Sequence, residues 1–373
     1  MVLKNFFERI ENQYNKALPF VVYRKPNSSN VKALLQNDAK LHTADTFTET
    51  GFVFSPFDDE QGCILIPINN SHLTEVAFNV AAENNQESIG TLVSFEEKLK
   101  HLSLINKGIE AVKNNKFTKV VLSRKESVGL SETDPISIFR KLLNKYPLAF
   151  VYCWYHPKVG LWLGATPETL LKIEGNRFSI MALAGTQDYK GSIDVVWKDK
   201  EINEQQIVTD FIIEHLKPSV DNIKINETET VKAGNLLHLR TMISAQLKPE
   251  VYQLKQLISD LHPTPAVCGF PKNVAKKFIL ENENYNREFY TGFLGELNFE
   301  RRIAPKSSKK NIENRAYAVT AKSTQLYVNL RCMQLEGKNA HIYIGGGITE
   351  TSNAEAEWEE TVSKSKIIKS ILQ

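Results

Sequence analysis

Two long segments of the chain repeat apolar residues with a helical period. Residues 94–115 form the first, and Ser94 and Glu97 have the spacing of a capping box at its start. Residues 198–216 form the second, so both are predicted to be amphipathic helices packed against a core. The predicted apolar side of the first carries Phe95, Leu99, Leu102, Ile105, Ile109 and Val112. That of the second carries Ile202, Ile207, Phe211 and Leu216.

Runs of β-branched and aromatic residues predict strands between and after these helices. The run 117–126 is one such strand, and 148–155 with 160–166 predicts a hairpin around the residues HPKV. A second hairpin is predicted from 325–337 and 339–347. Two further helices are expected: one with Asp134 as N-cap and Pro135 in its first turn, and a closing helix over 353–372.

Long strands in hairpins, mixed with separate helices, predict an α+β fold with mostly antiparallel sheet. No internal repeat or low-complexity linker divides the 373 residues. The loosest stretch is the polar segment 300–315, which reads as a hairpin loop or a small insertion. Residues 1–93 contain short strand-like runs such as GCILIPI and carry no identifiable chemistry.

Composition excludes several classes of protein. Lys and Arg exceed Asp and Glu by a net charge of only +3, and the basic residues are scattered, so a nucleic-acid partner is not expected. The N-terminal segment lacks the apolar core of a signal peptide, and no apolar run approaches the roughly 20 residues that span a bilayer. The cysteines lie far apart without CxxC spacing, which favours reduced thiols in a soluble cytoplasmic protein. They are Cys63, Cys153, Cys268 and Cys332.

Two residues at strand positions could carry acid–base chemistry. Alternation places four residues on one face of the 117–126 strand: Phe117, Lys119, Val121 and Ser123. If that face is interior, burial disfavours the charged form of Lys119 and leaves an amine able to take a proton; the alternative is an edge-strand lysine that prevents pairing with other chains. Glu168, in GATPETLL, either complements the first turn of a helix or is a carboxyl among apolar strands that donates a proton near neutral pH.

Two pairs of glutamates have i, i+3 spacing: Glu201 with Glu204, and Glu357 with Glu360. Both members of such a pair leave the same side of a helix one turn apart, where like charges repel. A shared Mg²⁺ would reverse the sign of the interaction, because this ion prefers oxygen ligands and is typically held by one or two carboxylates plus an anionic substrate. An ordinary solvated helix face is the alternative for each pair.

Two short runs follow strand-like segments and contain glycine. The first is Ala184, Gly185 and Thr186, and the second is Gly345, Gly346 and Gly347. Glycines there permit close backbone approach, and their N–H groups can bind a carboxylate or phosphate; simple tight turns are the alternative. Neither run has the spacing of a dinucleotide fingerprint or a P-loop, so no nucleotide is implied.

Nine segments occur in the order found in the chorismate-utilising enzymes, and the chain resembles that family, with isochorismate synthases as its most similar members. The segments are KVVLSR, GATPETLL, ALAGT, KEINEQQIV, HLRT, HPTPAVCGFPK, VNLRC, GGGIT and AEWEETVSK. The resemblance covers Ser94 to the C-terminus, whereas residues 1–93 correspond to the variable N-terminal part of the family. It implies one α+β domain, residues 1–373, with two large, mainly antiparallel sheets packed together, peripheral helices, and a chorismate-binding catalytic core over 94–373.

The resemblance also implies roles for the residues that match its motifs. Lys119 falls on the general base and Glu168 on the general acid. Glu204 and Glu360 fall on the Mg²⁺ ligands. Glu201 and Glu357 would act near them through water. The substrate-binding positions are Gly185, Thr186, His238, Arg331, Gly345, Gly346 and Lys364.

These roles imply a Mg²⁺-dependent isomerisation of chorismate to isochorismate, in which water adds at C2 and the C4 hydroxyl leaves. Lys119 would deprotonate the water and Glu168 would protonate the departing hydroxyl. Arg331 suits a bidentate grip on the enolpyruvyl carboxylate. In such enzymes the product feeds menaquinone synthesis in some organisms, and catechol siderophores or salicylate in others.

Two positions separate the members of this family by mechanism. Aminodeoxychorismate synthases carry a lysine nucleophile where this chain has Ala184, and anthranilate synthases, which use ammonia, generally lack the lysine found here at 119. No glutamine amidotransferase subunit is therefore expected. A salicylate synthase, which also eliminates pyruvate, is the alternative, and the segment with Val267 and Cys268 is where such a difference would lie. A third hypothesis is that the protein keeps this fold but only binds an anionic ligand, without catalysis.

Overall fold

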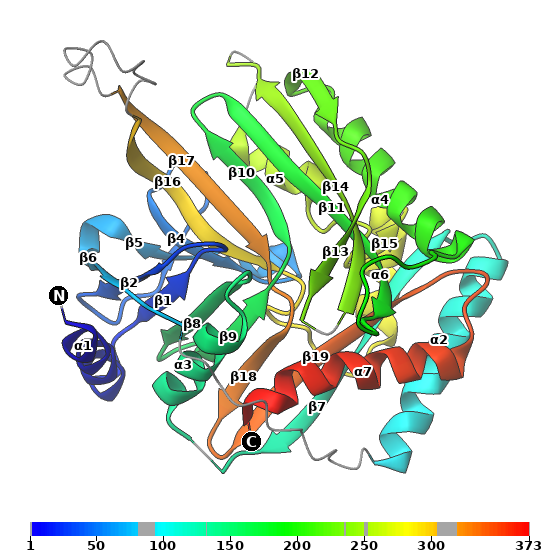
Figure 1. The fold of residues 1–373 in the computed structure, drawn as a ribbon, viewed down its shortest axis with the longest axis horizontal. Helices are drawn as coiled ribbons and strands as arrows, with labels where there is room; N and C mark the ends of the chain where they lie inside the picture. The colour runs from blue at the N-terminus through cyan, green and yellow to red at the C-terminus, as the bar shows by residue number, and fades with distance from the viewer. Residues whose placement is uncertain are drawn as a thin grey trace.

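The computed structural model describes residues 2–80, 94–131, 133–234, 236–249, 253–303 and 319–372. Over these residues the chain forms two large antiparallel sheets with helices around them, which confirms the predicted fold class (Figure 1). The helices are α1 (Leu3–Asn15), α2 (Phe95–Lys113), α3 (Pro135–Lys145), α4 (Asp199–Leu216), α5 (Leu254–Leu261), α6 (Lys272–Asn282) and α7 (Ala354–Leu372). None of the helices in these ranges is long and apolar enough to cross a membrane.

The first sheet has the strand order β15-β7-β19-β18-β9-β8-β1-β2-β6 in the described part of the chain. Its strands are β1 (Phe20–Arg24), β2 (Asn30–Gln36), β6 (Ser71–Ala77), β7 (Lys119–Gly129), β8 (Phe150–His156), β9 (Gly160–Thr166), β15 (Gly269–Phe270), β18 (Cys332–Glu336) and β19 (Asn339–Ile348). The N-terminal segment therefore joins this sheet directly, because β1 pairs with β8.

The second sheet has the order β12-β14-β11-β10-β17-β16-β4-β5-β3, with β13 paired to β14. Its strands are β3 (His42–Thr43), β4 (Gly51–Ser55), β5 (Ile64–Pro67), β10 (Thr169–Glu174), β11 (Arg177–Asp188), β12 (Val220–Ile225), β13 (Glu229–Ala233), β14 (Leu236–Leu247), β16 (Phe293–Ile303) and β17 (Val319–Val328). The segment 1–93 contributes here too, since β4 pairs with β16.

An aromatic core lies between the two sheets. Strand β8 shows how the sequence builds it: Phe150, Tyr152 and Trp154 point into this core, where they meet β4 residues such as Phe54. The alternate residues of β8, including Val151, pack on the other face of the sheet with α1, α3 and α7. Both faces of the strand are thus covered, which explains why its sequence is continuously apolar instead of alternating.

Helices α2 and α4 form where predicted, but the faces that they bury differ from the predicted ones. Ser94 is the N-cap of α2 without a side-chain capping hydrogen bond, so the predicted capping box is wrong. Phe95 and Leu99 are 74% and 50% exposed, because α2 packs through the face that carries Ile105 and Gly108. At Gly108 an added Cβ would lie 2.9 Å from Leu122 Cδ1, so glycine permits the close approach of α2 to β7.

In the first turns of α4 the predicted apolar side is also wrong. Ile202 is 48% exposed, whereas Gln205, Val208 and Phe211 are buried. The helix rests on β11 through this face, and Gln205 Nε2 donates to the Ala182 carbonyl at 3.1 Å. The periodicity predicts the helix correctly. It does not predict that the buried face includes the polar residue Gln205, whose side chain is satisfied by a buried carbonyl.

The predictions for the later strands are partly confirmed. The 148–166 hairpin forms as β8 and β9, and Asp134 caps α3 by accepting hydrogen bonds from the backbone N–H groups of Ile136 and Ser137. The predicted hairpin of 325–337 with 339–347 is wrong in its first half, because residues 325–328 belong to β17 in the second sheet, and only β18 and β19 pair as a hairpin. Most of the polar segment 300–315 lies outside the described residues.

The four cysteines are free and buried, in agreement with the prediction of reduced thiols. Phe117, which was predicted to share a face with Lys119, instead packs with Val120 and Leu122. It precedes β7, which begins only at Lys119, so strand alternation does not extend back to it.

A buried ion pair joins the segment that follows α6 to the strand that begins at Lys119. Arg287 donates two hydrogen bonds to the Glu283 carboxylate, at 2.6 and 2.7 Å, and a third to the Val121 carbonyl at 2.7 Å. Glu283 in turn accepts from the backbone N–H and the hydroxyl of Ser123, at 2.7 and 2.8 Å. The pair therefore fixes the backbone of β7 beside the cavity described below.

Replacing Arg287 by methionine is expected to lower the free energy of unfolding by about 3–5 kcal/mol, because it leaves the Glu283 carboxylate buried without its counter-ion. Urea denaturation measures the loss. Lys277→Met is the control in the preceding helix, α6, since its pair with Glu281 is exposed and should contribute nothing measurable. Equal stability of the two variants would contradict the role given to Arg287.

Candidate active site

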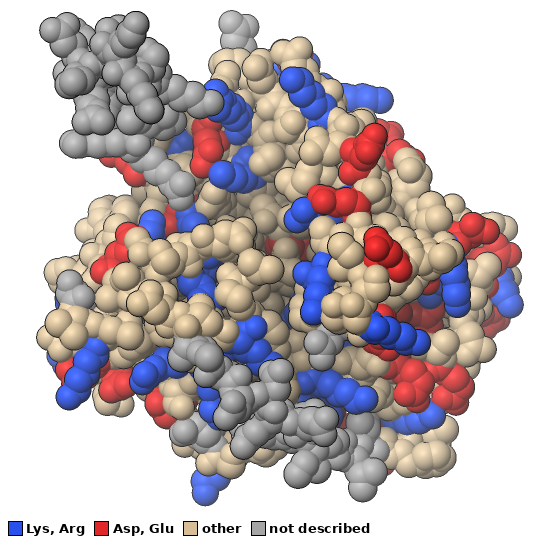
Figure 2. Space-filling view, viewed as in Figure 1, with Lys and Arg blue, Asp and Glu red and all other residues tan. Residues whose placement is uncertain are grey.

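A cavity of about 850 Å³, including its open mouth, lies where the two sheets meet. Figure 2 shows this face of the molecule hollowed near its centre, with Lys and Arg side chains close to the rim. Its walls come from β7, β11, β14, β19, α4, α7 and four connecting segments. Of the sequence-predicted residues, the lining includes Glu168, Gly185, Thr186, Glu204, His238, Arg331, Gly345, Gly346, Glu360 and Lys364.

Glu168 lies in the connection between β9 and β10, and the predicted helix start at Thr166 and Pro167 is wrong. Its side chain is 4% exposed. Burial raises the pKa of the Glu168 carboxyl to about 8, although Lys119 and Arg331 oppose the shift. The group is therefore protonated at neutral pH and can donate a proton into the cavity.

Lys119 is fully buried at the start of β7. The edge-strand reading is wrong, because β15 covers one side of β7 and β19 covers the other. Its Nζ lies 2.7 Å from Glu204 Oε1. Burial alone would raise the pKa of Glu204, but the charge and hydrogen bond of Lys119 outweigh it and keep the pKa below its ordinary value.

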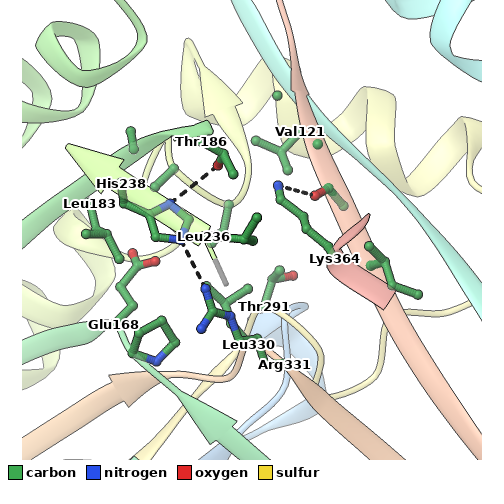
Figure 3. A pocket seen from close by; sticks show the side chains of 18 of the residues that line it. Val121, Glu168, Leu183, Thr186, Leu236, His238, Thr291, Leu330, Arg331 and Lys364 are labelled. Atoms are coloured by element: carbon green, nitrogen blue, oxygen red, sulfur yellow. Dashed lines mark hydrogen bonds between the residues drawn. The ribbon is translucent and has the colours of Figure 1, made fainter. Parts of the chain in front are cut away.

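Arg331, His238 and Glu168 point toward one another in Figure 3. Arg331 Nη2 lies 3.0 Å from His238 Nε2, and His238 Nδ1 lies 2.9 Å from the Gly185 carbonyl oxygen. Because the guanidinium can only donate, Nε2 accepts and the Nδ1–H donates to Gly185. Burial, reinforced by Arg331, lowers the pKa of His238 to about 3, so this neutral tautomer persists at any ordinary pH.

The two glycine runs lie inside β11 and β19, so the alternative interpretation of each run as a simple tight turn is wrong. Residues 184–187 form an irregularity in the pairing of β11 with β14, and Gly345 to Gly347 pair with β7. Gly185 has φ +69°, a conformation that disfavours a side chain. A Cβ at Gly347 would lie 2.5 Å from Glu204 Oε1, so the close approach predicted for the second run is confirmed.

Three glutamates on α4 and α7 converge on this glycine strand, and each has a lysine partner. Glu204 pairs with Lys119, Glu360 with Lys364 at 2.7 Å, and Glu357 with Lys200. Lys364 Nζ also donates to the Gly345 carbonyl at 2.9 Å (Figure 3). As these side chains stand, no three His, Cys, Asp or Glu groups of the described chain are arranged to hold a metal ion.

The carboxylates nevertheless fit a hard divalent cation. They supply only oxygen donors, which Mg²⁺ requires. Glu357 Oε2 is buried without a hydrogen-bond partner. It lies 3.7 Å from the position that a Cβ atom would occupy at Gly346, and Glu360 Oε1 lies 4.0 Å from the same position. Glu201 is placed differently: its carboxylate accepts from the Lys198 backbone N–H at 3.0 Å at the start of α4.

Lys200 and Tyr290 are the residues of this site that the sequence did not single out. Lys200 is four positions before Glu204, a spacing that indicates a pair within α4, yet it reaches Glu357 on α7 instead. Tyr290 lines the cavity, and its hydroxyl lies 2.8 Å from the Cβ position of Gly345. No local pattern in the sequence marks it.

A family model described as "Chorismate binding enzyme" matches residues 64–302, and a second model of that description matches 317–370. The chain belongs to the chorismate-binding enzyme family. The matched ranges contain every residue placed in the cavity above.

Curated relatives within this family are modestly similar. Isochorismate synthase DhbC of Bacillus subtilis is 25% identical over 70% of this chain, and isochorismate synthase MenF of Pasteurella multocida is 30% identical over 72% of it. The matches span 64% and 60% of those two proteins.

The fold is also that of solved family members. The menaquinone-specific isochorismate synthase MenF of Escherichia coli superposes with a TM-score of 0.74 at 18% identity, over 95% of this chain and 89% of that one. A DhbC from Bacillus anthracis gives the same TM-score at 19% identity, over 97% and 99% of the two chains.

Proposed function

We propose that the protein is an isochorismate synthase, converting chorismate to isochorismate with Mg²⁺. The observation that carries the proposal is a neutral buried acid, Glu168, in the cavity wall, together with the buried amine of Lys119, which does not itself line the cavity but contacts the lining residue Glu204. The names of the curated relatives agree with it. The proposal includes one domain over 1–373, with the catalytic core in 94–373, and a cytoplasmic location.

In this proposal the chain's residues divide the reaction between two proton transfers. Lys119 acts as the base and takes a proton from the water that adds at C2. Glu168 gives its proton to the C4 hydroxyl, which leaves as water, and the next proton exchange with solvent resets both groups. Neutral His238 holds Arg331 against the substrate side of the cavity, and the guanidinium binds the enolpyruvyl carboxylate.

Glu204 and Glu360 are proposed as the direct Mg²⁺ ligands, with Glu357 and Glu201 acting through water. The bound ion would orient the ring carboxylate of chorismate and withdraw electron density from the ring. Lys364, Gly345 and Gly346, which lie beside Glu360, would complete the carboxylate site, and Gly185 and Thr186 would hold the substrate from β11.

Single positions in the cavity wall bear on the other activities known in the family. Ala184 lines the cavity where an aminodeoxychorismate synthase carries its lysine nucleophile, and its methyl group cannot attack a ring. Neither ammonia chemistry nor an amidotransferase subunit is therefore proposed. A salicylate synthase shares the acid, the base and the alanine, and differs in eliminating pyruvate. In the segment that contains Val267 and Cys268, Val267 and its neighbour Ala266 line the cavity, whereas Cys268 does not. A difference from a salicylate synthase in this segment is therefore proposed at Val267 or Ala266.

Purified protein given chorismate and Mg²⁺ is expected to yield an isochorismate peak by HPLC. Excess EDTA should abolish the product, because the carboxylates then have no divalent ion, and surplus Mg²⁺ should restore it. Salicylate with equimolar pyruvate would establish the alternative activity. Absence of turnover, with chorismate bound, would leave a binding protein, and turnover that persists in EDTA would exclude the metal.

A further inference from the structure

Lys200 has no role in the mechanism proposed above, yet its ammonium contacts one of the carboxylates of the proposed metal site. It extends from the first turn of α4 to α7, where Nζ contacts Glu357 Oε1. The lysine side chain is 25% exposed and the glutamate side chain only 3%. In the described part of the chain this is the single ion pair between α4 and α7.

The charges around Lys200 belong to three of the four proposed metal ligands. Burial lowers the pKa of Lys200, but Glu357, Glu360 and Glu204 together raise it above its ordinary value. The Lys200 ammonium is therefore close enough to interact electrostatically with Glu204 of α4 and with Glu357 and Glu360 of α7. Lys200 therefore places positive charge, on a flexible stem, beside carboxylates proposed to hold the divalent ion, of which Glu204 and Glu360 also have lysine partners of their own.

We propose that Lys200 is an internal counter-ion that takes the place of the divalent cation in the metal-free protein, and that the cation displaces it when it binds. The Lys200–Glu357 bridge between α4 and α7 is then exchanged for a metal bridge between the same helices. This inference rests on the metal site of the proposed function.

The physical reason is the cost of leaving Glu357 without a cation. The Glu357 side chain is buried and one turn from Glu360, so desolvation and a like charge both act against ionisation. A tethered ammonium offsets that cost whenever the metal is absent. An Mg²⁺ held by Glu204 and Glu360, and reaching Glu357 through water, would lie close to the Lys200 ammonium. The two cations would repel, and the partly exposed lysine can move toward solvent.

Displacement lowers the affinity for the free metal ion, because each binding event must break the bridge. If the bridged state is populated at about 90% or more, the apparent Kd for metal is raised at least about ten-fold over that of the open site. The acidic cluster stays neutralised without metal, so the fold does not depend on the ion.

The test compares the wild-type chain with Lys200→Gln, using Mn²⁺ as the probe and following its binding by electron paramagnetic resonance without substrate. The variant is expected to bind Mn²⁺ with a Kd about ten-fold lower, since the competing cation is gone. Its melting temperature should lie several degrees below wild type in EDTA and equal wild type at saturating Mn²⁺. Lys200→Arg, which keeps the charge, should retain wild-type affinity.

Lys98→Gln is the matched control, because Lys98 pairs with Glu355 on the exposed side of α7 and should change neither quantity. Lys200→Met, which keeps the aliphatic stem, gives the same two readouts should the glutamine variant not fold. An unchanged Kd overturns the inference, as does a melting-temperature deficit that persists at saturating Mn²⁺, which would mark a permanent structural ion pair. Failure of the wild-type protein to bind Mn²⁺ even with chorismate would instead refute the metal site itself.

Discussion

Lys119→Ala is expected to lower kcat for isochorismate formation by about 10²–10⁴-fold, the usual contribution of a general base. The lysine is fully buried, and its Nζ contacts Glu204 of the cavity wall. A thousand-fold loss corresponds to about 4 kcal/mol of transition-state stabilisation. Initial rates by HPLC at saturating chorismate and Mg²⁺ measure the effect.

A structural loss must be separated from a chemical one, because the substitution also removes the partner of the Glu204 carboxylate. Added primary amines should partly restore the rate in Lys119→Ala if the lysine acts as a base, since a small amine can occupy the vacated space. Lys116→Ala, an exposed lysine three residues earlier, should keep wild-type activity. A wild-type rate in Lys119→Ala would remove the base assignment.

Glu168→Gln should reduce kcat by a similar factor, about 10²–10⁴-fold, because the amide cannot donate a proton to the C4 hydroxyl. In the wild-type protein the acid works only while protonated. Its pKa of about 8 in the free protein means that kcat/KM should fall as pH rises through about 8, and this limb should be absent in the variant. Rates between pH 6 and 9.5 provide the comparison.

The free energy of unfolding gives an independent test: Glu168→Gln lowers activity but is expected to raise stability relative to wild type as pH rises. The pKa of Glu168 is raised from 4.5 to about 8 on folding, so its contribution to stability is fully present below about 4.5 and is lost as pH rises through about 8. Glutamine does not titrate. The variant should therefore gain on wild type by up to about 1.4 kcal/mol per pH unit across that window. Glu174→Gln, at the end of β10 in a half-exposed pair with Lys172, should show neither effect. A variant less stable than wild type at pH 9 would contradict the buried neutral acid.

Local signals predicted much of the architecture. The Asp134–Pro135 start of α3 depends on a few adjacent residues, and the structure shows the expected cap. The apolar runs of β8 and β9 depend only on side-chain type and alternation. Where the predictions failed, a distant contact decided the outcome: residues 325–328 and 332–336 are close in sequence but pair with different sheets.

The candidate site divides in the same way. The i, i+3 spacing of its glutamates and the glycines beside them can be read from single helices and strands, and the order of the motifs indicates the family. The protonation of Glu168 cannot be read locally, because it depends on burial under both sheets and on the opposing charges of Lys119 and Arg331. The same four letters, TPET, also permit a helix start.

The sequence by itself determined which side chains are available: one buried-strand lysine, two acidic pairs on helices, and glycine runs that permit close approach. Only the tertiary structure decided how they pair, with Glu204 contacting Lys119 of β7 and Glu357 contacting Lys200 of α4. The physical reason is range. Helix and strand periodicities are set by neighbours a few residues apart, whereas ion pairing and desolvation depend on segments that lie 80 to 160 residues apart in sequence and meet only when the sheets pack.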